Sequence, residues 1–237
     1  GPATVFDKAT DYIGKSIPRS DASRLLRGKG HYVDDIQLPR MVHAVFLRSP
    51  HAHAKIISID IKEAEKAKGV MAIYTGNDIA KHVEPYVGVL SHLPGLRSPA
   101  QYPLAVDVAR WQGEPVAVVV CSSRALGEDA LELINISYEP LPAVTDTLDA
   151  LSSESPIIHR EYDSNLAWKR EVEVGSLDKA LSGDDVVVIE RQMKFGRHTG
   201  VTLETRATVC DYVSGDDELI MYYAGQAPHM LQFILAK

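Results

Sequence analysis

The sequence of 237 residues contains only two cysteines, Cys121 and Cys210, which lie far apart along the chain. An iron–sulfur cluster usually needs four thiolates and a structural zinc site needs a local group of ligands, so cysteine can build neither site in this chain. We expect two buried free thiols, as in a cytosolic protein. If the protein serves redox chemistry, its electron-carrying clusters must lie on another chain.

Positive charge and long apolar runs are also scarce. Lys+Arg number 25 against Asp+Glu 32, which gives a formal net charge of -7. This balance argues against nucleic acid or an anionic membrane as partner, because both require a basic patch. No apolar run approaches the roughly 20 residues that a membrane-spanning helix needs, and the N-terminus has no signal-peptide pattern. We therefore expect a cytoplasmic protein.

The first two thirds of the sequence contain a series of short strand patterns. The wholly apolar run at 114–121 predicts a central strand, because both of its faces must be buried. Together with the helices below, the strands predict one α+β domain over residues 25–145. Apolar or alternating runs predict the strands at 43–48, 55–60, 70–74, 114–121 and 134–138.

Two helices are predicted among these strands. A run rich in Glu, Lys and Ala over 61–68 ends at Gly69, which is the residue that helix C-termini favour. A second helix is predicted over 124–133, with Ser122 or Ser123 as its N-terminal cap. The fold class is therefore α+β.

The stretch 146–155 is acidic and rich in serine, which is typical of a joint between domains. It leads us to expect three parts, namely an N-terminal extended segment, a first domain and a second, incomplete domain. Their predicted bounds are 1–24, 25–148 and 149–237.

The second domain is predicted to begin with long strands at 185–195 and 202–213. Ser214-Gly-Asp-Asp predicts a hairpin turn between 202–213 and a strand at 218–223. A helix is predicted from near Gln226 into Lys237, where the chain stops without a cap or breaker. We expect a fragment, or a chain that a partner completes.

Several polar side chains are candidates for chemistry. His51 and His53 lie two apart, so a strand would place both imidazoles on one face, as for a metal site. No third ligand is evident and Ser49-Pro50 indicates a turn, so a structural role is the favoured interpretation. His198, Glu204 and Arg206 could perform acid–base work, or Glu204 and Arg206 could form a buried pair that holds the fold.

Gln226 precedes Pro228 at a predicted junction of strand and helix. A side-chain amide there can both donate and accept a hydrogen bond, and helix N-termini favour oxyanions. The other interpretation is an ordinary helix start with proline in its first turn. No serine or cysteine lies in a nucleophile elbow, which gives hydrolase chemistry no support.

A set of short strings occurs in one order along nearly the whole chain. The most recognisable are Gly113-Glu-Pro-Val-Ala-Val-Val-Val and Tyr138-Glu-Pro-Leu-Pro-Ala-Val. With these strings, the sequence resembles the N-terminal part of the molybdenum-binding large subunit of the xanthine dehydrogenase, aldehyde oxidase and carbon monoxide dehydrogenase family. The further strings lie at 13–19, 21–30, 32–36, 43–54, 198–204 and 226–229.

The resemblance implies an α/β hammerhead domain, followed by the beginning of the first cofactor-binding domain. The family is a group of oxidoreductases that hydroxylate carbon centres with oxygen from water. Their cofactor is molybdenum held by molybdopterin, usually the cytosine dinucleotide form in bacteria. Gln226 matches a glutamine that approaches the metal's oxo ligand. His198, Glu204 and Arg206 would be supporting side chains around it, and no residue of this chain would ligate the metal.

The resemblance also implies that essential parts lie outside this sequence. A Phe-Gly-Gly loop and the glutamate general base would follow downstream in the complete subunit. We therefore expect the isolated chain to be inactive and to hold no cofactor. Expected partners are the remainder of the molybdenum subunit, an iron–sulfur subunit and a FAD subunit, whereas the substrate stays open.

Two other functions stay possible at this point. The first is a cofactor-free interaction or assembly module that pairs with the rest of a split subunit. The second is a small metal hydrolase that uses His51, His53 and Glu204. Exposed apolar surface on the strand pair 202–223 would favour a cofactor-binding piece that awaits its other half, and metal analysis would test the hydrolase.

Overall fold

The computed structural model describes residues 12–88 and 92–236, which form two compact units. The unit that we call the sheet unit contains Pro39–Phe195 and the described residues from His229 onward. The second, which we call the hairpin unit, contains the described residues up to Leu38 together with Gly196–Pro228. Within the described ranges, no helix has the length and apolar character needed to cross a membrane.

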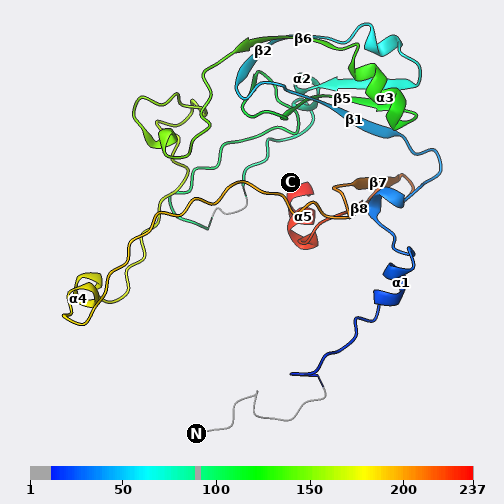
Figure 1. The fold of residues 1–237 in the computed structure, drawn as a ribbon. Coiled ribbons are helices and arrows are strands. Elements are labelled where there is room, and N and C mark those ends of the chain that lie inside the picture. The colour runs from blue at the N-terminus through cyan, green and yellow to red at the C-terminus, as the bar shows by residue number, and fades with distance from the viewer. Residues whose placement is uncertain (1–11, 89–91, 237) are drawn as a thin grey trace. The chain divides into compact units, whose positions relative to one another are not determined.

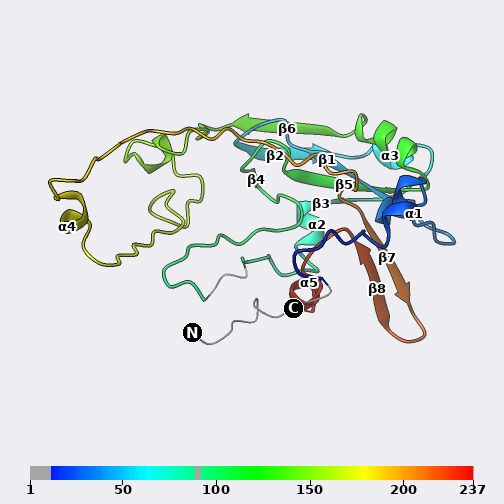
Figure 2. The ribbon, with the colours of Figure 1, turned by 60° about the horizontal axis from the view of Figure 1, so that its bottom comes forward.

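The sheet unit is built on two antiparallel sheets of three strands each (Figures 1 and 2). One sheet has the order β1-β5-β3, and the other has the order β4-β2-β6. The strand bounds are β1 His43–Arg48, β2 Ala54–Asp60, β3 Val70–Thr75, β4 Val108–Ala109, β5 Pro115–Cys121 and β6 Asn135–Pro140.

Strand β5 is the centre of the core, as its wholly apolar sequence predicted. Val116, Ala117 and Val119 are fully buried, and both neighbours of the strand pair with it antiparallel. Each valine buried in this way stabilises the fold by roughly 1.5–3 kcal/mol. Helix α3 (Arg124–Leu131) packs against β1 and β5 and closes the core from one side (Figure 1).

The helix predicted at 124–133 is confirmed. Ser123 has an extended backbone and its hydroxyl accepts the backbone N–H of Leu126, which makes Ser123 the N-terminal cap. The helix predicted over 61–68 is wrong, because only the 3-10 turn η3 (Ala64–Lys66) forms there. The chain must pass from β2 in one sheet to β3 in the other within this stretch, and buried Ala64 fixes a tight turn.

The hairpin unit contains β7 (Thr208–Val213) and β8 (Glu218–Tyr223), which pair antiparallel. The turn predicted between them is confirmed, with Asp217 in the left-handed region at φ 52. The Tyr212 hydroxyl donates to Asp217 Oδ1 across 2.6 Å and closes the turn. The unit also contains α1 (Ala22–Leu26) and the 3-10 turn η2 (Val33–Asp35), which contacts β7.

The remaining elements are short. Helix α2 (Gly76–Ile79) follows β3, η4 (Asp149–Leu151) lies in the acidic stretch, and α4 (Leu177–Leu181) begins after a Ser176 cap. Helix α5 (Pro228–Leu235) begins two residues later than predicted, with Pro228 as its first residue. The predicted domain bounds at 24, 148 and 237 stay a prediction.

Three other predictions are wrong. No strand forms at 185–195, and the strand predicted from residue 202 begins only at Thr208. A strand requires a ladder of backbone hydrogen bonds, and the described residues form no strand ladder over 185–195 or 202–206. Cys121 is buried as predicted, but Cys210, on the two-stranded hairpin, is exposed.

Candidate functional site

One end of the β7–β8 hairpin carries two of the predicted site residues. The ladder continues one pair beyond Thr208 and Tyr223, since the Ala224 N–H donates to the Ala207 carbonyl across 3.2 Å. Arg206 precedes this pair on one side and Gln226 follows it on the other. Antiparallel pairing therefore brings these two side chains, twenty positions apart in sequence, to the same end of the hairpin.

Gln226 is exposed in the short link between β8 and α5. Any other residue in place of Gly225 would displace the Tyr223 ring, because a Cβ there would lie 1.9 Å from it. The link therefore folds closely over that ring, and the Tyr223 hydroxyl is buried without a hydrogen-bond partner. The exposed Gln226 amide and the buried Tyr223 hydroxyl are therefore polar groups without a hydrogen-bond partner in the described residues at this end of the hairpin.

His198, Glu204 and Arg206 lie in the irregular segment before β7, and not in a strand. His198 and Arg206 are exposed, whereas Glu204 is half-buried and accepts the Val33 N–H over 3.4 Å. Within the described ranges, no ion pair joins Glu204 to Arg206. The buried pair suggested by the sequence is therefore wrong, and Glu204 instead holds the η2 turn.

His51 and His53 each have a structural contact. The His51 ring meets Tyr138 edge-on, with ring centroids 4.9 Å apart, and buried His53 places Nδ1 2.7 Å from the Pro142 carbonyl oxygen. Over residues 12–88 and 92–236, no group of three or more His, Cys, Asp or Glu side chains is arranged to hold a metal ion. These contacts favour the structural interpretation of both histidines.

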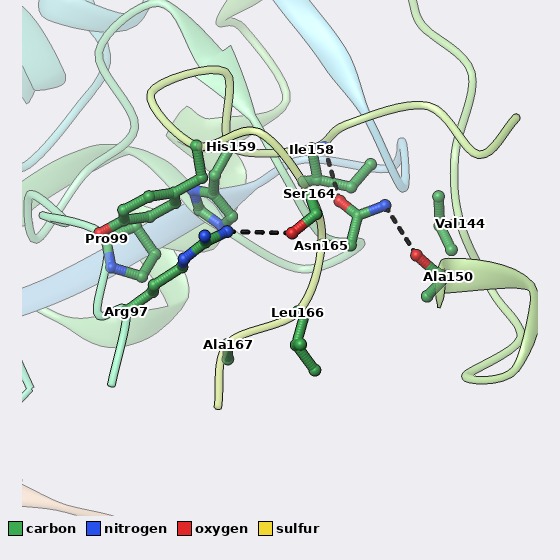
Figure 3. A pocket seen from close by; sticks show the side chains of 11 residues that line it. Arg97, Pro99, Val144, Ala150, Ile158, His159, Ser164, Asn165, Leu166 and Ala167 are labelled. Carbon is green, nitrogen blue, oxygen red and sulfur yellow. Dashed lines mark hydrogen bonds between the residues drawn. The ribbon is translucent and has the colours of Figure 1, made fainter. Parts of the chain in front are cut away.

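The sequence analysis missed a pocket of about 290 Å³ in the sheet unit (Figure 3). The Arg97 guanidinium lies 5.6 Å from the Tyr162 ring centroid and donates to Asp163 and Ser164. This pairing holds the pKa of the Asp163 carboxyl below its ordinary value. Arg97 lies in a proline-rich loop, and no sequence motif connects it to residues more than sixty positions later.

Asn165 organises the opposite wall of this pocket. Its amide oxygen accepts the Ile158 N–H at 3.0 Å, and its nitrogen donates to the Ala150 carbonyl (Figure 3). The same nitrogen also donates to the Pro156 carbonyl. His159 also lines the pocket, where burial, with the nearby Arg110 charge, lowers its pKa below the ordinary value. Asn165 and Arg97 thus form their hydrogen bonds with other residues of the protein.

Glu114 is a buried carboxyl whose role the sequence did not reveal. Its side chain accepts the backbone N–H of Arg110, and its backbone carbonyl accepts the N–H of Ser49 at 2.8 Å. Burial raises the pKa of Glu114 above its ordinary value. Glu114 belongs to the Gly-Glu-Pro string on which the family resemblance rests. Its hydrogen bonds to Arg110 and Ser49 give this string a structural role at the start of β5.

Two family models match this chain. The aldehyde oxidase and xanthine dehydrogenase a/b hammerhead domain matches residues 27–142, and the molybdopterin cofactor-binding domain matches residues 158–237. The first match covers both sheets, and the second covers the β7–β8 hairpin and Gln226. The α+β fold class and the order of the two domains are therefore confirmed.

Curated relatives align over nearly the whole chain. The nicotine 6-hydroxylase large subunit of Paenarthrobacter nicotinovorans is 34% identical over 94% of this chain and 27% of its own. The carbon monoxide dehydrogenase large chain of Afipia carboxidovorans is 30% identical over 94% of this chain and 28% of its own. The chain therefore spans little more than a quarter of the length of these relatives.

A solved structure has a similar fold over nearly the whole chain. Quinoline 2-oxidoreductase from Pseudomonas putida 86 matches with a TM-score of 0.81 and 35% identity, over 94% of this chain and 29% of that chain. The chain belongs to the xanthine dehydrogenase, aldehyde oxidase and carbon monoxide dehydrogenase family, and it corresponds to the N-terminal part of the molybdenum-binding large subunit.

Proposed function

We propose that this chain is the scaffold end of a molybdenum hydroxylase, an oxidoreductase that inserts water-derived oxygen into a carbon centre. The match of residues 158–237 to a molybdopterin cofactor-binding domain carries this proposal. Relatives named for nicotine, quinoline and carbon monoxide lie at similar identity, so the substrate class stays open. The isolated chain would be inactive, because it would form only part of the site.

The cofactor would be molybdenum–molybdopterin, in its cytosine dinucleotide form. When bound, it supplies the redox centre that accepts electrons from the substrate. Gln226 would contribute its exposed side-chain amide, which can donate a hydrogen bond to an oxygen ligand of the metal. Gly225 and the Tyr223 ring fix the course of the backbone next to Gln226, and this limits the positions that the amide can reach.

Arg206 would support the same wall, because the Ala207–Ala224 bond holds the segment with Arg206 beside the link that carries Gln226. Its guanidinium favours negative charge at that end of the hairpin. Glu204 would act indirectly, by holding the η2 turn through the Val33 N–H. His198, in the same irregular segment, would be a further supporting side chain.

The complete protein would assemble from several subunits in the cytoplasm. The remainder of the molybdenum subunit would complete the cofactor site, while an iron–sulfur subunit and a FAD subunit would carry electrons away. The two cysteines of this sequence, one buried and one exposed, cannot by themselves supply four thiolates. An iron–sulfur cluster would therefore take its thiolates from outside this sequence.

The rival proposal is a cofactor-free assembly module. Such a module would be polar on its outside, whereas Tyr212 and Leu219 of the hairpin are 60% and 55% exposed. A two-stranded sheet with exposed apolar side chains is marginally stable by itself, so another part of the subunit would cover this surface. This observation favours the cofactor-binding piece.

The test is to co-express the complete large subunit with its two partner subunits and to measure the purified complex. We expect molybdenum and cytosine dinucleotide in stoichiometric amounts with the large subunit. A well-folded complex without molybdenum would refute the proposal.

A further inference from the structure

A long loop of the hammerhead domain is tied together at its base. Between α2 and β4, the described residues form no helix or strand, apart from the isolated bridge of Tyr86 with Gln101. The Gly88 N–H also donates to the Ser98 hydroxyl across 2.8 Å. Long loops whose ends lie close together are frequently functional elements. The part that concerns us is residues 92–101, which we call the 92–101 loop.

Two hydrogen bonds join the backbone of this loop to residues 162–168, which we call the 162–168 segment. The Arg97 N–H donates to the Ala167 carbonyl across 2.9 Å. In the opposite direction, the Trp168 indole N–H donates to the Pro94 carbonyl across 3.1 Å. Neither stretch forms a strand, so these bonds satisfy backbone groups that no sheet supplies with partners.

The Arg97 side chain adds three contacts with the same segment. Its Nη1 donates to the Asp163 carboxyl. The same nitrogen donates to the Ser164 hydroxyl across 2.9 Å, as Figure 3 shows. The guanidinium carbon lies 5.6 Å from the centroid of the Tyr162 ring, within the range of a cation–π contact. A planar guanidinium suits this combination, because its face can stack while its edge donates.

The ion pair at this contact lies largely in solvent. The side chains of Arg97 and Asp163 are 36% and 81% exposed, so water screens their attraction and the pair stabilises the fold only a little. The buried core lies elsewhere, around β5 and α3. Loss of the pair should therefore release the loop from the segment and leave the two sheets folded.

The two sides of the contact belong to different domains. The 92–101 loop lies within the hammerhead match at 27–142, and the 162–168 segment lies within the molybdopterin-domain match at 158–237. Between the two matches, residues 143–157 form only the 3-10 turn η4. A joint of this kind permits motion between the domains that it connects, unless further contacts restrict it.

We propose that the 92–101 loop is an interdomain clasp and that Arg97 is its central positioning residue. The clasp holds the first residues of the molybdopterin-binding domain on the hammerhead domain, and Asp163 supplies the charge that Arg97 requires. This inference goes beyond the proposed function, because it concerns how the two domains are joined and involves neither cofactor nor substrate.

Hydrogen–deuterium exchange of the complete large subunit, in its complex, tests the proposal. The reporter is the backbone amide of residue 97, which donates across the contact. Arg97→Asp would face Asp163 with a like charge and lose the contact with Tyr162, so we expect the protection of this amide to fall about tenfold. The amides of β5 should keep their protection. Unchanged protection at residue 97, or an equal loss in β5, would overturn the proposal.

Reversal of both charges separates a positioning role from a general effect on stability. Arg97→Asp combined with Asp163→Arg restores an opposite pair but not the contact with Tyr162. We expect the protection at residue 97 to return to within about threefold of the wild type. A residue with only a general role in stability would not be rescued by a change in its partner. A double variant no better protected than Arg97→Asp would contradict the clasp.

Two further variants complete the set. Arg191→Asp, at an exposed position, makes the same change of charge away from the contact and should leave residue 97 fully protected. An equal loss in this control would overturn the proposal. Arg97→Lys keeps the charge but cannot stack in the same way, so the protection should fall about threefold. If Arg97→Asp does not fold, Arg97→Lys decides the matter, and full protection there would count against the clasp.

The result is separable from the test of the cofactor. Complexes prepared with and without molybdate in the medium should show the same protection at residue 97, because the contact involves only side chains and backbone of this chain. Protection in a complex that takes up no molybdenum would refute the proposed function and leave the clasp standing. A complex that holds molybdenum while residue 97 is unprotected would overturn the clasp alone.

Discussion

The Ala224 N–H donates to the Ala207 carbonyl across 3.2 Å, one pair beyond the last residues of β7 and β8. This bond holds together the two chain segments that carry Arg206 and Gln226. A strand register, rather than any local motif, therefore places a guanidinium and an amide at one end of the hairpin.

Gln226→Ala should lower the turnover of the complete complex without affecting its assembly. Removing a hydrogen-bond donor that acts on developing charge lowers kcat by about 100-fold to 1000-fold. The exposed side chain carries no packing role in the described structure. Steady-state kinetics normalised to molybdenum content provides the measurement. The exposed Gln232→Ala is the control, and unchanged turnover of Gln226→Ala would refute the assigned role.

His53→Ala should destabilise the protein and leave its metal content unchanged. The substitution removes the partner of the Pro142 carbonyl within a buried site, which costs about 1–3 kcal/mol. Denaturant unfolding and metal analysis of the complete large subunit measure both effects. His82→Ala, at an exposed position, is the control. A specific loss of metal from His53→Ala would restore the metal-binding interpretation of His51 and His53.

Gly127→Ala should destabilise the fold although alanine favours helices more than glycine does. A Cβ at this position of α3 would lie 2.4 Å from Cys121 Sγ and 2.6 Å from Val45 Cγ2. Overpacking of this kind costs about 1–3 kcal/mol and exceeds the gain in helix propensity. Thermal unfolding should show a lower Tm.

The control on the same helix is Glu128→Ala, which removes only the exposed pair with Arg124. Its cost should stay near 0.2–0.5 kcal/mol. If Gly127→Ala proved as stable as the wild type, the close packing of α3 on β1 and β5 would be wrong.

Glu114→Gln should remove the part of the pH dependence of the free energy of unfolding that the Glu114 carboxyl causes. Burial raises the pKa of Glu114 in the folded state above its ordinary value of 4.5, so the folded state binds the proton more tightly than the unfolded state. The stability linked to this proton is complete below pH 4.5 and is lost as the pH rises through the folded-state pKa.

Urea unfolding between pH 4 and pH 8 measures this effect through the free energy of unfolding. The slope contributed by Glu114 should vanish in Glu114→Gln, and the exposed Glu132→Gln controls for the loss of one charge. An identical slope in the wild type and in Glu114→Gln would contradict the assignment.

Much of the sheet unit could be predicted from the sequence, because its signals are local. The apolar run of β5 requires burial on both faces, and the Ser123 hydroxyl caps α3 within three residues. The turn at 214–217 also follows from its own residues. Gln226 could be placed before a helix, but its nearness to Arg206 could not, since that depends on the register of the hairpin.

The sequence by itself determined the strands β1, β2, β3, β5 and β6, the Ser123 cap, the family motifs and the shortage of thiolates for a cluster in this sequence. Only the tertiary structure decided that 61–68 forms a tight turn between two sheets, that Arg97 pairs with Asp163 and that Cys210 is exposed. It also decided that no strand forms over 185–195. The reason is physical: propensity acts over a few neighbours, whereas burial and strand pairing depend on residues distant in the chain.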